Sequence, residues 1–185
     1  MKKLIVMLSI AGAAFMSHAA SVYWTCTNVY AGNASDTVSG VAYFLTTDML
    51  AYSDAQALQG KGASAITAAL GSAYSYQGSD GAFGKATADA VSNAALGLAD
   101  SSNYTAYLMI FDTAEVTDSS KFYLTPTKSL ATFSGTETGS VKFGTQKTAS
   151  QSSANWVSAG AIPEPTSALL LLVGGAMLAL RRKQK

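Results

Sequence analysis

The sequence predicts an α+β protein with a strand-rich body, a small helical insertion and a C-terminal transmembrane helix. Residues 41–46 and 104–111 are apolar runs of strand length, with β-branched and aromatic residues and apolar side chains on both faces. Residues 63–70 are Ala-rich and repeat apolar side chains at helical spacing. Residues 166–180 are uncharged and mostly apolar. A β-sandwich with a helical insertion is the arrangement of the body that fits these elements best.

The first predicted strand covers residues 21–30, where aromatic, β-branched and Thr residues predominate. Because side chains alternate along a strand, Val22, Trp24 and Cys26 should share one face. Residues 31–40 follow with Gly, Asn, Asp and Ser, a composition typical of a loop. The apolar run after this loop should therefore be a second strand, central in its sheet and buried on both faces.

Helical segments are predicted between the two apolar strands. Thr47 or Asp48 can cap a first helix, and the Ala-rich segment at 63–70 forms a second one after a Gly-rich break. Residues 73–84 are rich in Gly, which is compatible with either a hairpin or a mobile loop. Residues 86–98 combine small and apolar side chains, and we expect a third packed helical stretch there.

Short strands are predicted for the last part of the body. Residues 121–125 form one strand, and residues 129–133 and 140–143 flank a Gly-containing loop as a β-hairpin. Residues 146–160 are rich in Ser and Ala, so we expect a linker there that contains one last short strand at Trp156.

The first 19 residues are typical of a secretory signal peptide. Lys2 and Lys3 precede an apolar run at residues 4–16, and Ser17 and Ala19 supply the small residues before a cleavage site. We therefore expect signal peptidase to cleave after Ala19. The alternative is an uncleaved N-terminal membrane anchor, but an apolar run of about 13 residues is short for a membrane span.

The composition of the body excludes several classes of function. The exported globular domain should cover residues 20–145. Residues 20–160 contain six Lys, no Arg, eight Asp and two Glu, a net charge of 6 − 10 = −4, so no basic footprint for nucleic acid is present. His18 is the only histidine and Cys26 the only cysteine. Once His18 leaves with the signal peptide, His-dependent catalysis and His-ligated metals are excluded within one chain, and we predict no catalytic, cofactor or metal site.

Two carboxylates and a set of aromatic side chains are the candidate functional residues of the body. Asp112 follows the strand at 104–111 and Glu115 lies three residues on, a pair that can serve glycoside hydrolysis. The simpler interpretation is that both carboxylates are exposed to solvent where the chain leaves the strand. Aromatic faces can instead stack on sugar rings, although Tyr in a small strand-rich domain more often fills the margin of the core. The aromatic candidates are Tyr23, Trp24, Tyr30, Tyr43, Tyr52, Tyr74, Tyr76, Tyr104, Tyr107, Tyr123 and Trp156.

The C-terminal 25 residues, 161–185, join a Pro-Glu-Pro tripeptide, a short apolar helix and a basic end in that order. This order resembles the PEP-CTERM sorting signal of bacterial surface and matrix proteins. The resemblance implies export in a Gram-negative bacterium that makes exopolysaccharide, temporary retention in the membrane lipid, and processing near the tripeptide by an exosortase-type transpeptidase. It implies no activity for the body. The residues that carry it are Pro163, Glu164, Pro165, Arg181, Arg182 and Lys183.

The length of the apolar helix favours a temporary anchor. Residues 166–180 span about 22 Å as a helix, against a hydrocarbon core of about 30 Å. The basic end at 181–185 should stay cytoplasmic and leave the body outside. The sequence therefore predicts a non-catalytic exported protein of the cell surface or extracellular matrix. A carbohydrate-binding module in the exopolysaccharide matrix and a carboxylate-dependent hydrolase are the alternatives.

Overall fold

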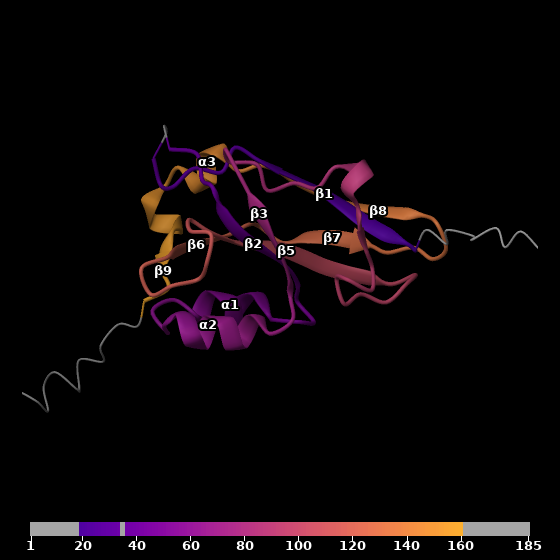
Figure 1. Ribbon diagram of the computed structural model, residues 1–185, viewed down its shortest axis with the longest axis horizontal. Helices are drawn as coiled ribbons and strands as arrows, with labels where there is room; N and C mark the ends of the chain where they lie inside the picture. The colour runs from indigo at the N-terminus through magenta and orange to yellow at the C-terminus, as the bar shows by residue number, and fades with distance from the viewer. Residues whose placement is uncertain (1–18, 34–35, 161–185) are drawn as a thin grey trace, which may run out of the picture.

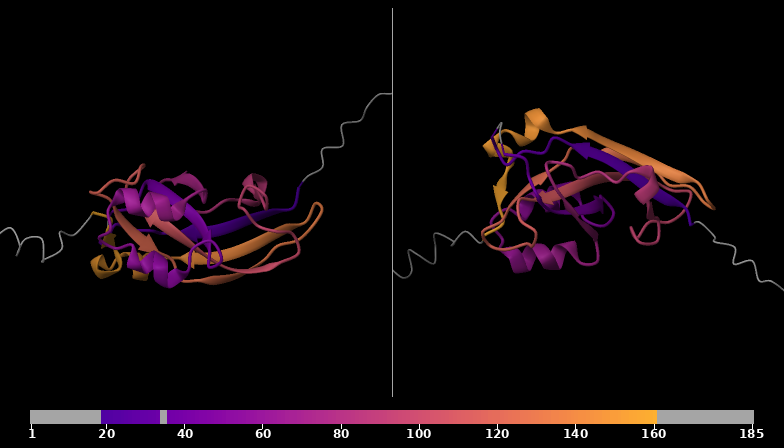
Figure 2. Two further views of the ribbon diagram at one scale, coloured as in Figure 1. Left: turned by 90° about the horizontal axis from the view of Figure 1, so that it is seen from below. Right: turned by 45° about the horizontal axis from the view of Figure 1, so that its top comes forward.

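The computed structural model describes residues 19–33 and 36–160, in which two β-sheets face each other and helices cover the other side of the larger sheet (Figure 1, Figure 2). The predicted signal peptide up to residue 18 and the whole segment 161–185, with its tripeptide, apolar helix and basic end, lie outside the described residues. Among the residues that are described, no helix combines the length and the apolar character needed to cross a membrane.

In the described part of the chain, the larger sheet has six strands. In spatial order they are β3 (Tyr74–Gly78), β2 (Gly40–Thr46), β5 (Asn103–Phe111), β6 (Lys121–Leu124) and β9 (Val157–Ser158), with β7 (Lys128–Ala131) also paired to β5. All these pairings are antiparallel. The two apolar runs predicted to be central, β2 and β5, are neighbours inside the sheet, and side chains on both of their faces are buried.

The smaller sheet packs on one face of the larger one. It consists of β4 (Val91–Ser92), β1 (Ser21–Thr27) and β8 (Thr138–Thr145), and β1 pairs antiparallel with β4 and parallel with β8. Alternation along β1 confirms the predicted face, because Val22, Trp24 and Cys26 are fully buried.

Two apolar cores hold the layers together. Between the sheets, the rings of Trp24 and Phe44 lie 4.8 Å apart between centroids, inside a cluster contributed by both sheets. On the opposite face of the larger sheet, α1 (Tyr52–Ala57) and α2 (Ala63–Leu70) bury side chains such as Ile66 against β2 and β5. The result is a strand-rich body of two sheets and few helices, consistent with a sandwich-like fold, with α2 at the predicted position.

The first helix begins later than the sequence predicts. α1 starts at Tyr52 after Ala51, and neither Thr47 nor Asp48 caps it. The backbone N–H of Thr47 instead donates to the carbonyl of Thr105 at 2.9 Å, which extends the pairing of β2 with β5. Because Thr47 is still hydrogen-bonded to the sheet, it cannot cap a helix, and α1 starts only after the following turn.

The helix predicted at residues 86–98 is wrong. The chain forms a short 3₁₀ turn at Thr87–Asp89, then β4, then further turns. The N–H of Asn93 donates to the carbonyl of Ala20 at 2.9 Å, which prolongs the contact between β4 and β1. One edge of β1 would otherwise leave backbone groups unpaired, so strand pairing outweighs the weak helical preference of small residues.

The hairpin predicted from residues 129–133 and 140–143 is also wrong, although both segments are strands. β7 pairs with β5, whereas β8 pairs with β1 in the other sheet, so the loop between them connects the two sheets. The reason lies in β5, which has nine residues. β6 pairs with Met109 to Phe111, and β7 takes the free edge from Asn103 to Ala106.

The Gly-rich stretch at residues 73–84 is neither a complete hairpin nor an open loop. β3 pairs with β2 and is followed by a tight turn in which Ser79 bridges Ala82, with Asp80 and Gly81 at positive φ. The chain then crosses to the other sheet, where Lys85 pairs with Trp24. Of the two alternatives, a hairpin or a mobile loop, the structure therefore has the turn of a hairpin, but the segment after the turn pairs with β1 instead of returning along β3.

Residues 146–160, predicted as a linker with one last strand, fold against the body. They form α3 (Lys147–Ser150), a 3₁₀ turn (Ser153–Asn155) and β9, which pairs with β6. Trp156 is 8% exposed, and its indole Nε1 donates to the carbonyl of Ser150 at 2.8 Å. These residues therefore form one end wall of the globular body (Figure 1).

Alkaline pH should destabilise this fold. Burial raises the pKa of the Cys26 thiol from 9.0 to about 12, and burial also raises the pKa of Tyr76 and Tyr107 above 10.0. A group whose pKa is higher in the folded than in the unfolded chain stabilises the fold fully while the pH is below its unfolded pKa, which is 9.0 for Cys26. This stabilisation is lost as the pH rises toward and through the folded pKa. Each group should lower the free energy of unfolding by about 1.4 kcal/mol per pH unit in its window.

Urea denaturation at pH 8, 10 and 11 measures this loss. The variant Cys26→Ala is the control, because it should remove the part of the pH slope that starts near pH 9. A free energy of unfolding that stays constant up to pH 11 would contradict the prediction.

Candidate functional site

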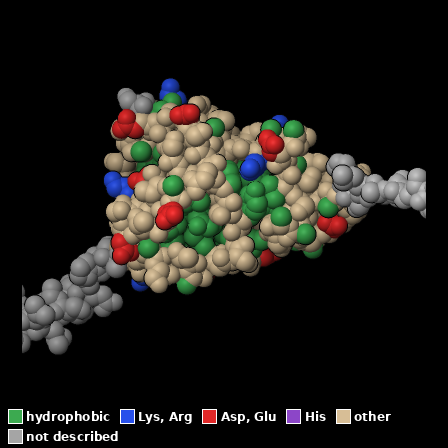
Figure 3. All heavy atoms as spheres, in the orientation of Figure 1, with side chains coloured by type: hydrophobic (Ala, Val, Ile, Leu, Met, Phe, Trp, Pro, Cys, Tyr) green, Lys and Arg blue, Asp and Glu red, His purple; other side chains and the backbone are tan. Residues whose placement is uncertain are grey.

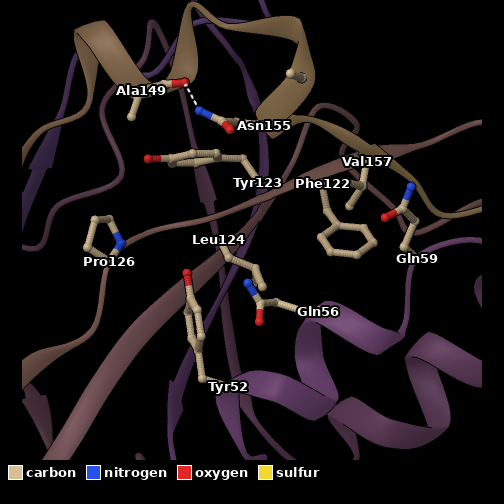
Figure 4. A pocket seen from close by; sticks show the side chains of 11 residues that line it. Tyr52, Gln56, Gln59, Phe122, Tyr123, Leu124, Pro126, Ala149, Asn155 and Val157 are labelled. Atoms are coloured by element: carbon tan, nitrogen blue, oxygen red, sulfur yellow. Dashed lines mark hydrogen bonds between the residues drawn. The ribbon is translucent and has the colours of Figure 1, made fainter.

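A cavity of about 350 Å³ opens where α1, β6 and the C-terminal segment meet (Figure 4). We call it the α1–β6 cleft. Pockets for small ligands have volumes of roughly 300–1,000 Å³, so this cleft is at the small end of that range. Its lining is aromatic, aliphatic and amide, with no charged side chain: Tyr52, Gln56, Gln59, Phe122, Tyr123, Leu124, Pro126, Ala149, Ala154, Asn155 and Val157.

One wall of the cleft comes from α1 and the turn after it. Tyr52, Gln56 and Gln59 stand at i, i+4 and i+7, so they follow one side of the helix while Ala55 faces the core. The ring of Tyr52 packs edge-on against Tyr107, at 5.1 Å between centroids and 85° between planes. This contact supports the half-buried Tyr52 ring at the rim of the cleft.

The opposite wall is built by β6 and the C-terminal segment. The hydroxyl of Tyr123 donates to Gln146 Oε1 at 2.7 Å, and its ring lies 5.7 Å from that of Trp156. Asn155 Nδ2 donates to the carbonyl of Ala149 at 2.9 Å, the dashed line in Figure 4. These bonds hold the wall in place and leave the Asn155 amide at the cleft.

The chemistry of the cleft is that of neutral hydrogen-bonding groups. Burial raises the pKa of Tyr52 and, more strongly, the pKa of Tyr123, so both phenols stay protonated at neutral pH. Neither Gln56 nor Gln59 makes a side-chain hydrogen bond within the described residues. The cleft can therefore offer amide and hydroxyl groups above an apolar floor, an arrangement that suits binding.

The candidate carboxylates lie elsewhere. Asp112 Oδ1 accepts the backbone N–H of Lys121 at 2.8 Å, and Glu115 is exposed in the loop between β5 and β6. Neither of them lines the α1–β6 cleft. No group of three or more His, Cys, Asp or Glu that could hold a metal occurs among the described residues. On the face in Figure 3, acidic and basic side chains are scattered rather than gathered into one patch.

Most of the aromatic candidates belong to the core or its margin. Trp24, Tyr76, Tyr107, Tyr123 and Trp156 are buried. The remaining candidates are half-buried: Tyr23, Tyr30, Tyr43, Tyr52, Tyr74 and Tyr104. The structure brings only two of the eleven candidates, Tyr52 and Tyr123, to the α1–β6 cleft.

No motif in the sequence singles out the amides of the cleft, Gln56, Gln59 and Asn155. The helical spacing of Tyr52, Gln56 and Gln59 was the one available signal. The sorting residues from Pro163 onward lie outside the described residues, and Ala19 is exposed at the start of the described chain.

Comparison with known protein families, with curated proteins and with solved structures gives no match to this chain. The function must therefore be inferred from the α1–β6 cleft and from the two terminal sequences.

Proposed function

We propose that this chain is a non-catalytic exported protein of the bacterial cell surface or extracellular matrix, sorted by a PEP-CTERM and exosortase-type system. Signal peptidase would remove residues 1–19. A transmembrane helix at 166–180 would hold the body in the membrane temporarily, until a transpeptidase recognises Pro163, Glu164 and Pro165.

The ends of the packed body support this proposal. The carbonyl of Ala20 accepts the Asn93 N–H at 2.9 Å, whereas Ala19 is exposed. At the other end, Ala159 is fully buried and its N–H donates to Ser120 at 2.9 Å. Both ends of the described body are thus held by backbone hydrogen bonds within it, close to the two expected processing sites.

Changing the tail should block processing without affecting the body. Replacing Glu164 by Ala, or deleting residues 181–185, should leave an unprocessed chain in the membrane fraction or misroute it. Cell fractionation and intact mass measure this in the native host. Glu137→Ala is the control, because Glu137 is exposed on the body and should not affect sorting. Unchanged mass and location in both tail variants would contradict the sorting proposal.

Carbohydrate binding is the second candidate function, and the α1–β6 cleft favours it. Amide groups and a half-buried Tyr ring beside apolar side chains are suited to a ligand that has both hydroxyl groups and apolar C–H faces. A carboxylate-dependent hydrolase has no comparable support, since Asp112 and Glu115 lie outside the cleft.

A glycan array tests carbohydrate binding. We expect the full chain to bind a small group of related glycans selectively. Because a cleft of this size makes few contacts, the dissociation constants should be modest, about 10⁻⁴ M. Bovine serum albumin on the same array controls for non-specific adsorption. Absence of binding to every glycan would contradict this function and leave the sorting proposal untouched.

A further inference from the structure

The edge of β6 is open where it lines the α1–β6 cleft. The N–H of Thr125 donates to the carbonyl of Leu108 in β5 at 3.0 Å. Because hydrogen bonding alternates along an antiparallel pair, Phe122 and Leu124 direct their backbone groups to the other edge. There β9 pairs Val157 with Phe122 and reaches no further toward Leu124. Within the described residues, the N–H and C=O of Leu124 therefore have no strand partner.

This open edge adds a backbone donor and acceptor to the amide groups of the cleft. Leu124 is half-buried and lines the cavity. In Figure 4, Tyr52 and Gln56 from α1 lie below β6, and Asn155 and Tyr123 lie above them on the opposite wall. Polar groups thus reach the cavity from α1 on one side and from β6 and the C-terminal segment on the other. A ligand with hydroxyl groups at several positions can satisfy them together.

We propose that the α1–β6 cleft binds one neutral pyranose unit of a glycan, and this inference rests on the carbohydrate-binding function proposed above. The ring of Tyr52 and the exposed Pro126 contact an apolar face of the sugar. Gln56, Gln59 and the backbone of Leu124 hydrogen-bond its hydroxyl groups.

The absence of charge in the cleft lining determines the class of sugar. A uronic acid or a sulfated sugar would bring an anion next to Tyr52, Phe122 and Val157, where no Lys or Arg lines the cavity to pair with it. Transferring an unpaired charge to such surroundings is strongly unfavourable. The cleft should therefore select neutral hexose units over acidic ones.

Titration calorimetry on the full chain tests this inference, in a zwitterionic detergent without a sugar headgroup. The probes are cellopentaose and mannopentaose as neutral glycans and trigalacturonate as an acidic one. We expect at least one neutral probe to bind at least tenfold more tightly than trigalacturonate. Tyr52→Ala should weaken that binding at least tenfold, and Gln56→Ala about fivefold.

Two features of the variants keep the result interpretable. Gln56 is exposed on a helix and Ala has the highest helix propensity, so Gln56→Ala should fold even if Tyr52→Ala loses packing on Tyr107. Tyr23→Ala is the matched control, because Tyr23 is also half-buried but lies on the outer side of β1. Its affinity should stay within twofold of the wild type.

Each contrary outcome has its own meaning. If none of the three probes binds and the glycan array is also blank, the carbohydrate-binding function fails and the inference with it. If neutral glycans bind but Tyr52→Ala and Gln56→Ala bind as tightly as the wild type, the function stands and the assignment to this cleft is wrong. If trigalacturonate binds as tightly as the neutral probes, the inferred selectivity for neutral sugars is overturned.

Discussion

Replacing Trp24 by Ala should lower the free energy of unfolding by about 4 kcal/mol, a large share of the roughly 5–15 kcal/mol typical of a domain. Trp24 is fully buried between the two sheets, where its ring packs against Phe44 and Tyr76 at 4.8 and 5.3 Å between centroids. Its Nε1 donates to Tyr76 Oη at 2.9 Å and to the Phe83 carbonyl at 3.0 Å. The substitution leaves a cavity and removes the indole donor from Tyr76 Oη, whereas the Phe83 carbonyl still accepts the hydroxyl of Tyr76.

Guanidinium denaturation followed by circular dichroism, on residues 20–160 in the wild type and the variant, measures the loss. Tyr76→Phe is the control, because it removes one hydroxyl while the Phe83 carbonyl can still accept from Trp24. It should cost only about 1 kcal/mol. A loss below about 1 kcal/mol for Trp24→Ala would show that the sheets do not depend on this side chain for their packing.

Replacing Trp156 by Ala should lower the free energy of unfolding by about 3 kcal/mol and also abolish the glycan binding that we propose for the α1–β6 cleft. The indole of Trp156 packs on Tyr123 and donates to Ser150, whose carbonyl also accepts the N–H of Gly32 at 3.0 Å. The residue thus ties the C-terminal segment to β6 and to the loop between β1 and β2. Without it, the wall that carries Asn155 loses its support.

Denaturation and calorimetry on the same preparation separate the two effects. Trp156→Phe keeps an aromatic ring on Tyr123 and loses the bond to Ser150, so it should cost about 1–2 kcal/mol and retain part of the binding. A Trp156→Ala variant as stable as the wild type would mean that residues 146–160 behave as a linker after all.

Local pattern was sufficient to predict several elements of the fold. The runs that form β2 and β5 have apolar side chains on both faces, and their strand length with β-branched and aromatic residues is typical of a strand buried from both sides. Alternation placed Val22, Trp24 and Cys26 on the inner face of β1. The helix α2 has its predicted bounds at Ala63–Leu70 because Gly residues flank an Ala-rich run with Ile66 and Leu70 at i and i+4.

Strand pairing could not be predicted in the same way. β7 and β8 are close in the chain, and a Gly-containing loop separates them, so a hairpin was the natural local expectation. Each of them instead pairs with a strand distant in sequence, β5 or β1. The choice depends on which strand edges remain open after the other strands have paired, and this is a property of the whole sheet.

The candidate site was almost wholly beyond prediction from the sequence. Its lining comes from three separate segments, around Tyr52, Tyr123 and Asn155. Tyr52 and Tyr123 were among eleven aromatic candidates with nothing to distinguish them. The amides Gln56, Gln59 and Asn155 carry no motif, because neutral hydrogen-bonding groups acquire a role only when a fold brings them to one cavity.

The sequence by itself determined the central strands, the second helix and the expectation of export and sorting, because each of these depends on residues that are neighbours in the chain. Periodicity defines a buried strand or a helical face, and the terminal signals are contiguous segments. Only the tertiary structure decided the pairing of β7 and β8, the packing of residues 146–160 onto β6 and the existence of the α1–β6 cleft. These features arise from backbone groups and side chains far apart in the chain that satisfy one another's hydrogen bonds and cover one another's apolar surface.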